Sequence, residues 1–304
     1  FGSSCFGSCF CVEPRSVFCM KTTIYLAKLV CTFVIQEALG KEQTIPIFRP
    51  HSKEELITAI VTLKLNRSHA LAKYGPTLTW STSLITDMSY LFYLYPEFED
   101  PIGSWDVSNV TNMSHMFARA CNFNHEISNW DTSRVTTMEA MWYHALVFDK
   151  PIGSWDTSRV TDMSRMFYYA EKFNQPIGGW RTSRVTTMST MFYNAHKFNQ
   201  PLNLWDTKNV KSMQAMFGGA NLFNQPLDTW DVSGVTDMTS MFEGAVSFRQ
   251  DISAWYVSSD FMAAFESMYT GTTTEGAMKV TSHTRGMALS IMHLVIAVIA
   301  AIFA

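Results

Sequence analysis

Residues 155–179 read W-D-T-S-R-V-T-D-M-S-R-M-F-Y-Y-A-E-K-F-N-Q-P-I-G-G, and variants of this stretch recur along the chain. Tryptophans stand at a constant interval of 25 residues, at Trp80, Trp105, Trp130, Trp155, Trp180, Trp205, Trp230 and Trp255. We number each repeat from its tryptophan, as positions 1 to 25. A fixed period without insertions is typical of repeat proteins, in which each unit packs on its neighbours.

The shared pattern is W-D-[VT]-S-x-V-T-x-M-x-x-M-F-x-x-A-x-x-F-N-x-P-[IL]-x-x. Positions 9, 12, 13 and 16 have the i, i+3, i+4, i+7 spacing of one face of a short helix, over residues 163–170 in the quoted unit. Positions 23, 1, 3 and 6 follow the spacing of a leucine-rich repeat, whose centre is a short strand, over residues 152–160. One repeat therefore predicts one strand and about two helical turns.

The two ends of a stack of repeats need capping elements, because the outermost apolar faces have no neighbouring repeat. Residues 52–65 (SKEELITAIVTLKL) predict a helix with a capping box at Ser52 and Glu55. The expected organisation is an N-terminal capping helix and lead-in at 41–79 and seven repeats at 80–254. A degenerate repeat and C-terminal cap follow at 255–270.

The repeats resemble the BspA-like leucine-rich repeat family of surface proteins, in the tryptophan-containing variant that also occurs in mycoplasma lipoproteins and in algal and protist proteins. The resemblance rests on W-D-x-S-x-V-T-x-M-x-x-M-F at a fixed period over residues 74–254. It implies an α/β repeat solenoid, a right-handed coil with short parallel strands, short helices and a helical N-terminal cap. It also implies cell-surface adhesion, without naming a ligand.

The first 40 residues predict a leader. Met20 and Lys21 precede an apolar stretch at 24–35 and a small-x-small sequence at 38–40, which is the order of a secretory signal peptide beginning at Met20. Lys28 interrupts the apolar stretch, so a leader without that function is the alternative.

The last residues predict a membrane attachment. Residues 287–304 are apolar except for Ser290 and His293, and a polar spacer at 271–286 precedes them. This order resembles a GPI-attachment signal. A plain membrane anchor is the alternative, although such a length barely crosses a bilayer. The expected location is the cell surface or secretory pathway, membrane-anchored, and the alternative is a tail-anchored protein with cytosolic repeats.

Two polar columns each allow two interpretations. Position 2 holds Asp106, Asp131, Asp156, Arg181, Asp206, Asp231 and Tyr256. These carboxylates could bind a cation or a basic partner, or they could accept local backbone N–H groups in Asx turns, which we favour. Position 20 holds Asn124, Asn174, Asn199 and Asn224. These amides could bind a ligand, or they could satisfy backbone groups at the turn, which we also favour.

No constellation typical of catalysis is present. The histidines share no repeat position, and no H-E-x-x-H spacing or phosphate-binding glycine loop occurs. Five cysteines lie within residues 5–31 in a spacing unlike that of zinc sites, and Cys121 is the sixth. The net charge of −3 gives no indication of the concentrated basic surface that binding of nucleic acid requires. We therefore expect a non-enzymatic protein without cofactor, metal or nucleic-acid partner.

Breaks in the regular columns point to a recognition patch in the middle repeats. The patch residues are Arg159, Arg181, Arg184, Leu204 and Lys208. They bring positive charge and one exposed apolar side chain to a region where other repeats carry Asp, Ser, Asn or Thr, although neutral drift on a solvated face would give the same pattern.

The sequons at Asn66, Asn109 and Asn112 are candidate glycosylation sites if the chain is secreted. The expected function is surface-anchored recognition or adhesion, with a protein or glycan bound through the solenoid and the membrane bound through the tail. The alternative is a structural cell-wall or coat component, in which the solenoids assemble laterally without a discrete ligand.

Overall fold

The computed structural model describes residues 47–252 and Trp255. The expected leader, polar spacer and hydrophobic tail lie outside the described residues, as does the expected C-terminal cap beyond Trp255. Within the described part, no helix combines the length and apolar character that crossing a membrane requires.

The chain begins its described part with helices. Helix α2 spans Lys53–Leu65, α3 spans Arg67–Tyr74, and a 3-10 turn, η1, spans Thr77–Thr79. The helix expected from residues 52–65 is thus present as α2. Ser52 caps it by accepting the N–H of Glu55 at 3.3 Å. The Glu55 carboxylate accepts the N–H of His51 at 2.7 Å, so the capping box closes one residue earlier than its usual form.

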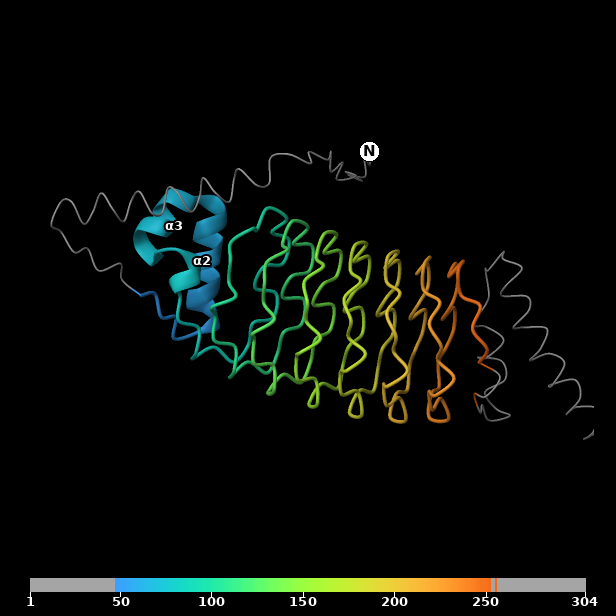
Figure 1. The fold of residues 1–304 in the computed structure, drawn as a ribbon. Coiled ribbons are helices and arrows are strands. Elements are labelled where there is room, and N and C mark those ends of the chain that lie inside the picture. The colour runs from blue at the N-terminus through green and yellow to red at the C-terminus, as the bar shows by residue number, and fades with distance from the viewer. Residues whose placement is uncertain (1–46, 253–254, 256–304) are drawn as a thin grey trace, which may run out of the picture. The chain divides into compact units, whose positions relative to one another are not determined.

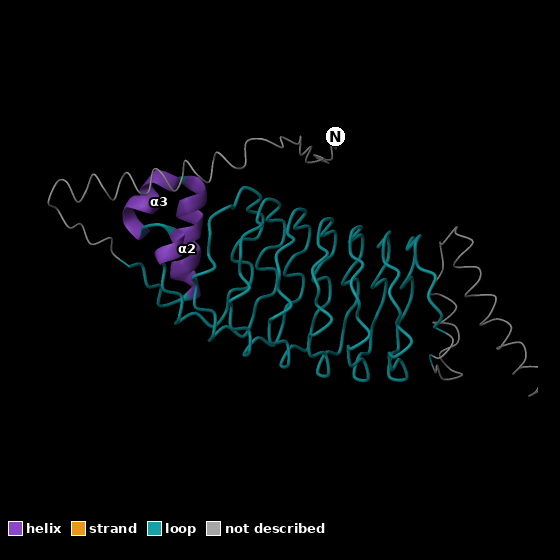
Figure 2. Cartoon of the chain, in the orientation of Figure 1, coloured by secondary structure: helices purple, strands orange, loops and turns teal. Residues whose placement is uncertain are grey.

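Helix α2 lies beside the first coil of the repeats (Figures 1 and 2). Lys53 Nζ donates to the Asp87 carboxylate at 3.0 Å, and Lys64 Nζ donates to the Leu94 carbonyl at 2.7 Å. Its apolar face, which includes Leu56 and Leu63, is fully buried. The helix therefore covers one end of the stacked repeats.

The repeats form a row of stacked coils, one per 25 residues (Figure 1). Parallel bridges join position 8 of each coil to position 8 of the next: Asp87–Asn112, Asn112–Thr137, Thr137–Asp162, Asp162–Thr187, Thr187–Ser212 and Ser212–Asp237. At position 7, each N–H donates to the carbonyl of position 7 in the preceding coil, as Thr161 does to Thr136 at 2.8 Å.

The short helices expected at positions 9–16 are not formed in the described repeats, where the chain makes turns instead. Positions 11 and 15 have positive φ in all seven coils, for example 58° at Arg165 and 55° at Tyr169. A left-handed residue at every fourth position interrupts the helical i→i−4 ladder.

Backbone N–H groups in this segment alternate between two partners. Those of Met163, Arg165, Phe167 and Tyr169 donate to carbonyls of the next coil at 2.7–3.2 Å. Those of Met166, Tyr168 and Ala170 donate to the carbonyl three residues earlier. Pairing with the next coil therefore replaces the expected helix.

The strand expected around positions 1–6 is also absent from the described coils, because side chains make the contacts between coils there. Each tryptophan from Trp130 to Trp255 donates its Nε1–H to the position 23 carbonyl that lies 28 residues earlier. Trp105 donates to the Thr77 carbonyl and Trp80 to the Gly75 carbonyl, and all eight distances lie between 2.8 and 3.3 Å. Position 3 threonines donate to the position 2 carbonyl of the next coil, as Thr157 does to Arg181 at 3.0 Å.

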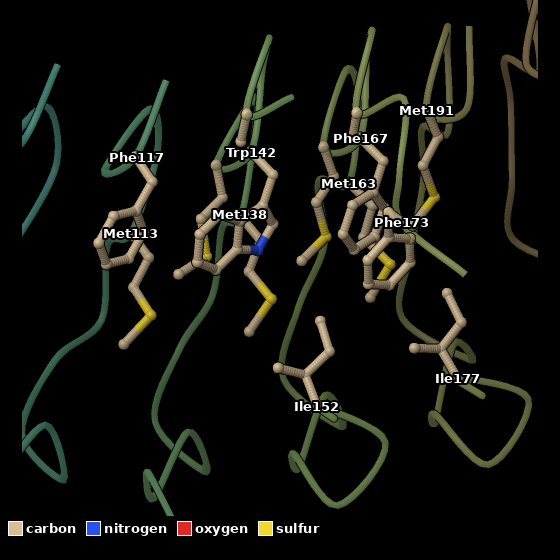
Figure 3. Close-up of a cluster of buried hydrophobic side chains, with 14 of the residues drawn as sticks. Met113, Phe117, Met138, Trp142, Ile152, Met163, Phe167, Phe173, Ile177 and Met191 are labelled. Atoms are coloured by element: carbon tan, nitrogen blue, oxygen red, sulfur yellow. The ribbon is translucent and has the colours of Figure 1, made fainter. Parts of the chain in front are cut away.

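The core is a continuous stack of rings and methionines. The eight repeat tryptophans are only 2–6 % exposed, and the indoles of five neighbouring pairs stack on one another, as in Trp180–Trp205 at 6.5 Å between centroids. Within each coil the position 13 ring stacks on the position 19 phenylalanine, at 3.9 Å for Phe167–Phe173. Methionines and isoleucines fill the space around these rings (Figure 3). Every coil therefore buries its apolar side chains against two neighbours.

Candidate functional site

The aspartates of position 2 form Asx turns. Asp106, Asp131, Asp156, Asp206 and Asp231 each accept the backbone N–H two residues later, at 2.9–3.3 Å. The hydrogen bonds from Ser158 hold the pKa of Asp156 below its ordinary value, and Arg181 and Arg159 lower it further. The turn interpretation of this column is therefore confirmed.

The asparagines of position 20 connect the coils. The Asn174 side-chain oxygen accepts the backbone N–H of Asn199 at 2.9 Å and the Gln200 amide at 3.1 Å, and Asn199 repeats the pattern with Asn224 and Gln225. Asp149 occupies the same position in its coil and accepts the N–H of Asn174. The interpretation that this column satisfies backbone groups is confirmed.

The five residues of the sequence-predicted recognition patch are all exposed, Leu204 by 76 %. They occupy positions 2, 4, 5 and 25 of three successive coils, along the edge where the tryptophan turns lie. Lys208 pairs with Asp206 of its own coil at 3.1 Å. No carboxylate of the described residues forms an ion pair with Arg181 or Arg184. Arg159 likewise has no such ion pair, so these three arginines carry the net positive charge of the patch.

A second surface was not predicted from the sequence. Apart from the buried Tyr74 and Tyr95, every tyrosine in the described part lies at position 11, 14 or 15: Tyr90, Tyr93, Tyr143, Tyr168, Tyr169 and Tyr193. We call Tyr143, His144, Tyr168, Tyr169 and Tyr193 the tyrosine edge. The signal was present in the sequence as W-Y-H-A, F-Y-Y-A and F-Y-N-A in three consecutive repeats.

The rings of the tyrosine edge stack in register. Tyr143 and Tyr168 are 4.8 Å apart between centroids with planes 7° apart, and Tyr168 and Tyr193 are 5.0 Å apart. His144 lies parallel to Tyr169 at 4.6 Å. All five side chains are half-buried. The edge is therefore an ordered aromatic row at the surface.

Two histidines of the described coils have a pKa below its ordinary value. Burial lowers the pKa of His115 and of His144, and the positive charge of Arg119 adds to the effect at His144. His115 stacks on Tyr90 at 4.5 Å, and its Nδ1 atom is buried without a hydrogen-bond partner. No group of three or more metal-binding side chains occurs among the described residues.

The three sequons differ in their surroundings. Asn66 is exposed at the junction of α2 and α3, where its side chain accepts the His69 N–H. Asn109 donates its amide to the Ser83 carbonyl at 2.8 Å, and Asn112 accepts the Ser114 N–H at 2.9 Å. The Asn109 amide nitrogen, which a glycan would occupy, is thus already bonded within the fold.

Tandem, equally spaced coils with a shared core define a repeat protein. The chain belongs to the family described as "Mycoplasma protein of unknown function, DUF285", whose model matches it twice in tandem, over residues 66–180 and 169–279. No curated protein and no solved structure shows significant similarity to the chain.

Proposed function

We propose that this chain is a surface-anchored, non-enzymatic recognition or adhesion protein that binds a protein or glycan partner along its stacked coils. The observation that carries the proposal is that the groups that hold the coils together differ from those that the coils expose to solvent. Backbone contacts, tryptophans, threonines and asparagines hold the coils together, whereas the exposed side chains of Arg181, Arg184 and Leu204 form no hydrogen bond or ion pair between the described coils. Repeat stacks bind along such extended surfaces.

The architecture that we propose is a leucine-rich-repeat-like, right-handed solenoid related to the BspA-like proteins. The 25-residue period, the parallel bridges at position 8 and the helix α2 at one end support it. Attachment to the cell surface through residues 287–304 is part of the same proposal. Mass spectrometry of the mature protein tests the attachment, because it shows whether the tail is retained or replaced by a lipid.

The recognition patch supplies the first binding surface of this proposal. Arg181 and Arg184 are exposed cations on one coil, and Leu204 adds an exposed apolar side chain on the same coil. Arginine is enriched among the residues that dominate binding energy at interfaces, because it combines charge with a planar hydrogen-bonding group. An acidic protein or glycan partner fits this surface.

The test is binding of the purified chain to cells or extracellular matrix after Arg181→Asp with Lys208→Ser. We expect binding to fall at least about tenfold, since two exposed cations are lost from the patch. The matched control is Lys172→Asp with Lys197→Ser, which changes the charge equally at two other exposed lysines. Unchanged binding in the patch variant would disprove the patch. Concentration-dependent assembly of the purified chain without any partner would favour the structural coat component.

A further inference from the structure

The tyrosine edge is not needed to build the coils. The position 14 carbonyl accepts an N–H from the preceding coil whether the residue is Tyr143, Tyr168, Ala118 or Gly218, at 2.7–3.1 Å in all four cases. The same turn therefore forms with an aromatic ring, a methyl group or a hydrogen atom at this position. The rings of Tyr143, Tyr168 and Tyr193 are therefore not required for the backbone conformation of the turn.

The chemistry that the edge offers is a row of neutral hydroxyl groups. None of the phenol oxygens of Tyr143, Tyr168, Tyr169 and Tyr193 is buried, and none bonds to another described residue. Because the rings stack face to face along the row, their outward parts are C–H edges and hydroxyls. Tyrosine offers such an amphipathic contact with little loss of side-chain freedom on binding.

The charges around the edge balance. Arg165 pairs with Glu139 at 3.5 Å, Arg119 lies beside His144, and Glu243 acts on Tyr193 at the other end. No single sign of charge dominates, so this surface does not select a charged polymer. The polar groups suit a ligand that carries many hydroxyls.

We propose that the tyrosine edge binds an uncharged, extended β-linked polysaccharide that runs along the stack, with one sugar unit facing each coil. The ring spacing of 4.8–5.0 Å is close to the length of one sugar in such a chain. A peptide strand along the same line advances only about 3.3 Å per residue, so its residues fall out of step with the rings. The inference deepens the proposed recognition function and uses an edge that lies apart from the recognition patch.

The experiment measures binding of cellohexaose and chitohexaose to the full chain by isothermal titration calorimetry, with maltohexaose, which is not extended, as the control sugar. The variant Tyr143→Phe with Tyr168→Phe and Tyr193→Phe keeps the stacked rings and removes only the hydroxyls. We expect binding of one or both extended sugars to weaken at least about tenfold in this variant, with an unchanged thermal midpoint. The patch variant Arg181→Asp with Lys208→Ser is expected to bind the sugars normally.

Three results would overturn the inference: no binding of either extended sugar, equal binding of maltohexaose, or equal sugar binding by the phenylalanine variant. Loss of a protein partner in the phenylalanine variant, without sugar binding by the unmodified chain, would reassign the edge to a protein. If the sugars fail while cell binding still depends on Arg181, the inference falls and the proposed function stands.

Discussion

At the scale of single residues, position 3 shows how one atom connects two coils. Position 3 is threonine in five coils and valine in two, and all seven side chains are buried. The threonine hydroxyls donate to the next coil, as Thr157 does to the Arg181 carbonyl. Val107 fills the same space without the bond.

We predict that Thr157→Val lowers the free energy of unfolding by about 1 kcal/mol, because the Arg181 carbonyl loses a buried donor while the packing volume is kept. Val107→Thr is the reverse change and should not destabilise the chain by as much. Urea unfolding followed by tryptophan fluorescence measures both. Equal losses in the two variants would show that packing, and not the bond, sets the preference.

Trp142 is the one departure from phenylalanine at position 13, and its buried Nε1–H has no partner in the described part. We predict that Trp142→Phe changes stability by less than about 1 kcal/mol, because removal of an unsatisfied donor offsets the lost volume. Phe167→Ala, at the same position of the next coil, should cost about 3–5 kcal/mol because it leaves a cavity. Thermal unfolding of both variants checks the contrast.

His115 and His144 make stability depend on pH. Burial lowers their pKa values in the folded chain below the ordinary 6.5. Below pH 6.5 the unfolded chain therefore takes up protons first, and stability falls until the folded pKa values are reached; above pH 6.5 their contribution is complete. We expect a lower thermal midpoint at pH 5 than at pH 7.5, and a smaller difference in the variant His115→Phe with His144→Phe. An identical difference in that variant would exclude these histidines as the cause.

At the scale of the element, the turn at positions 9–16 depends on left-handed residues. Thr190 is a β-branched residue with φ of 53°. The left-handed conformation raises the conformational energy of an L-residue by roughly 1–2 kcal/mol, and the increase is greatest for a β-branched residue.

We predict that Thr190→Gly raises the free energy of unfolding by up to about 1 kcal/mol, although glycine usually destabilises a chain through its freedom in the unfolded state. Lys172→Gly, at an exposed position without positive φ, is the control and should be destabilising. The urea midpoints of the two variants test this prediction. If both variants lose the same free energy of unfolding, the backbone is not strained at Thr190.

At the scale of the whole molecule, stability is a sum over contacts between neighbouring coils. Deletion of residues 155–179 removes one complete coil and joins Ser154 to Trp180, so the remaining repeat tryptophans keep their 25-residue spacing. We predict a folded chain with a lower urea m-value, since less surface is exposed on unfolding. Deletion of 155–166 shifts the period by half a coil and should abolish cooperative unfolding.

The sequence was sufficient to predict the 25-residue period, the inward tryptophans, helix α2 and the turn roles of the Asp and Asn columns. These features are local or are copied identically from repeat to repeat, so a single unit carries their information. The apolar spacing of residues 163–170, however, fits both a helix and a four-residue series of turns. The choice depends on whether N–H groups find acceptors within the coil or in the next one.

Only the tertiary structure decided that choice. Stacking brings the carbonyls of the next coil within 2.7–3.2 Å of alternate N–H groups, and these acceptors exist only once two coils have met. The same stacking aligned Tyr143, Tyr168 and Tyr193 into one row, because residues 25 apart become neighbours at the spacing of the coils. The sequence by itself determined what each coil contains, and contact between coils determined its backbone shape and the surface that it presents.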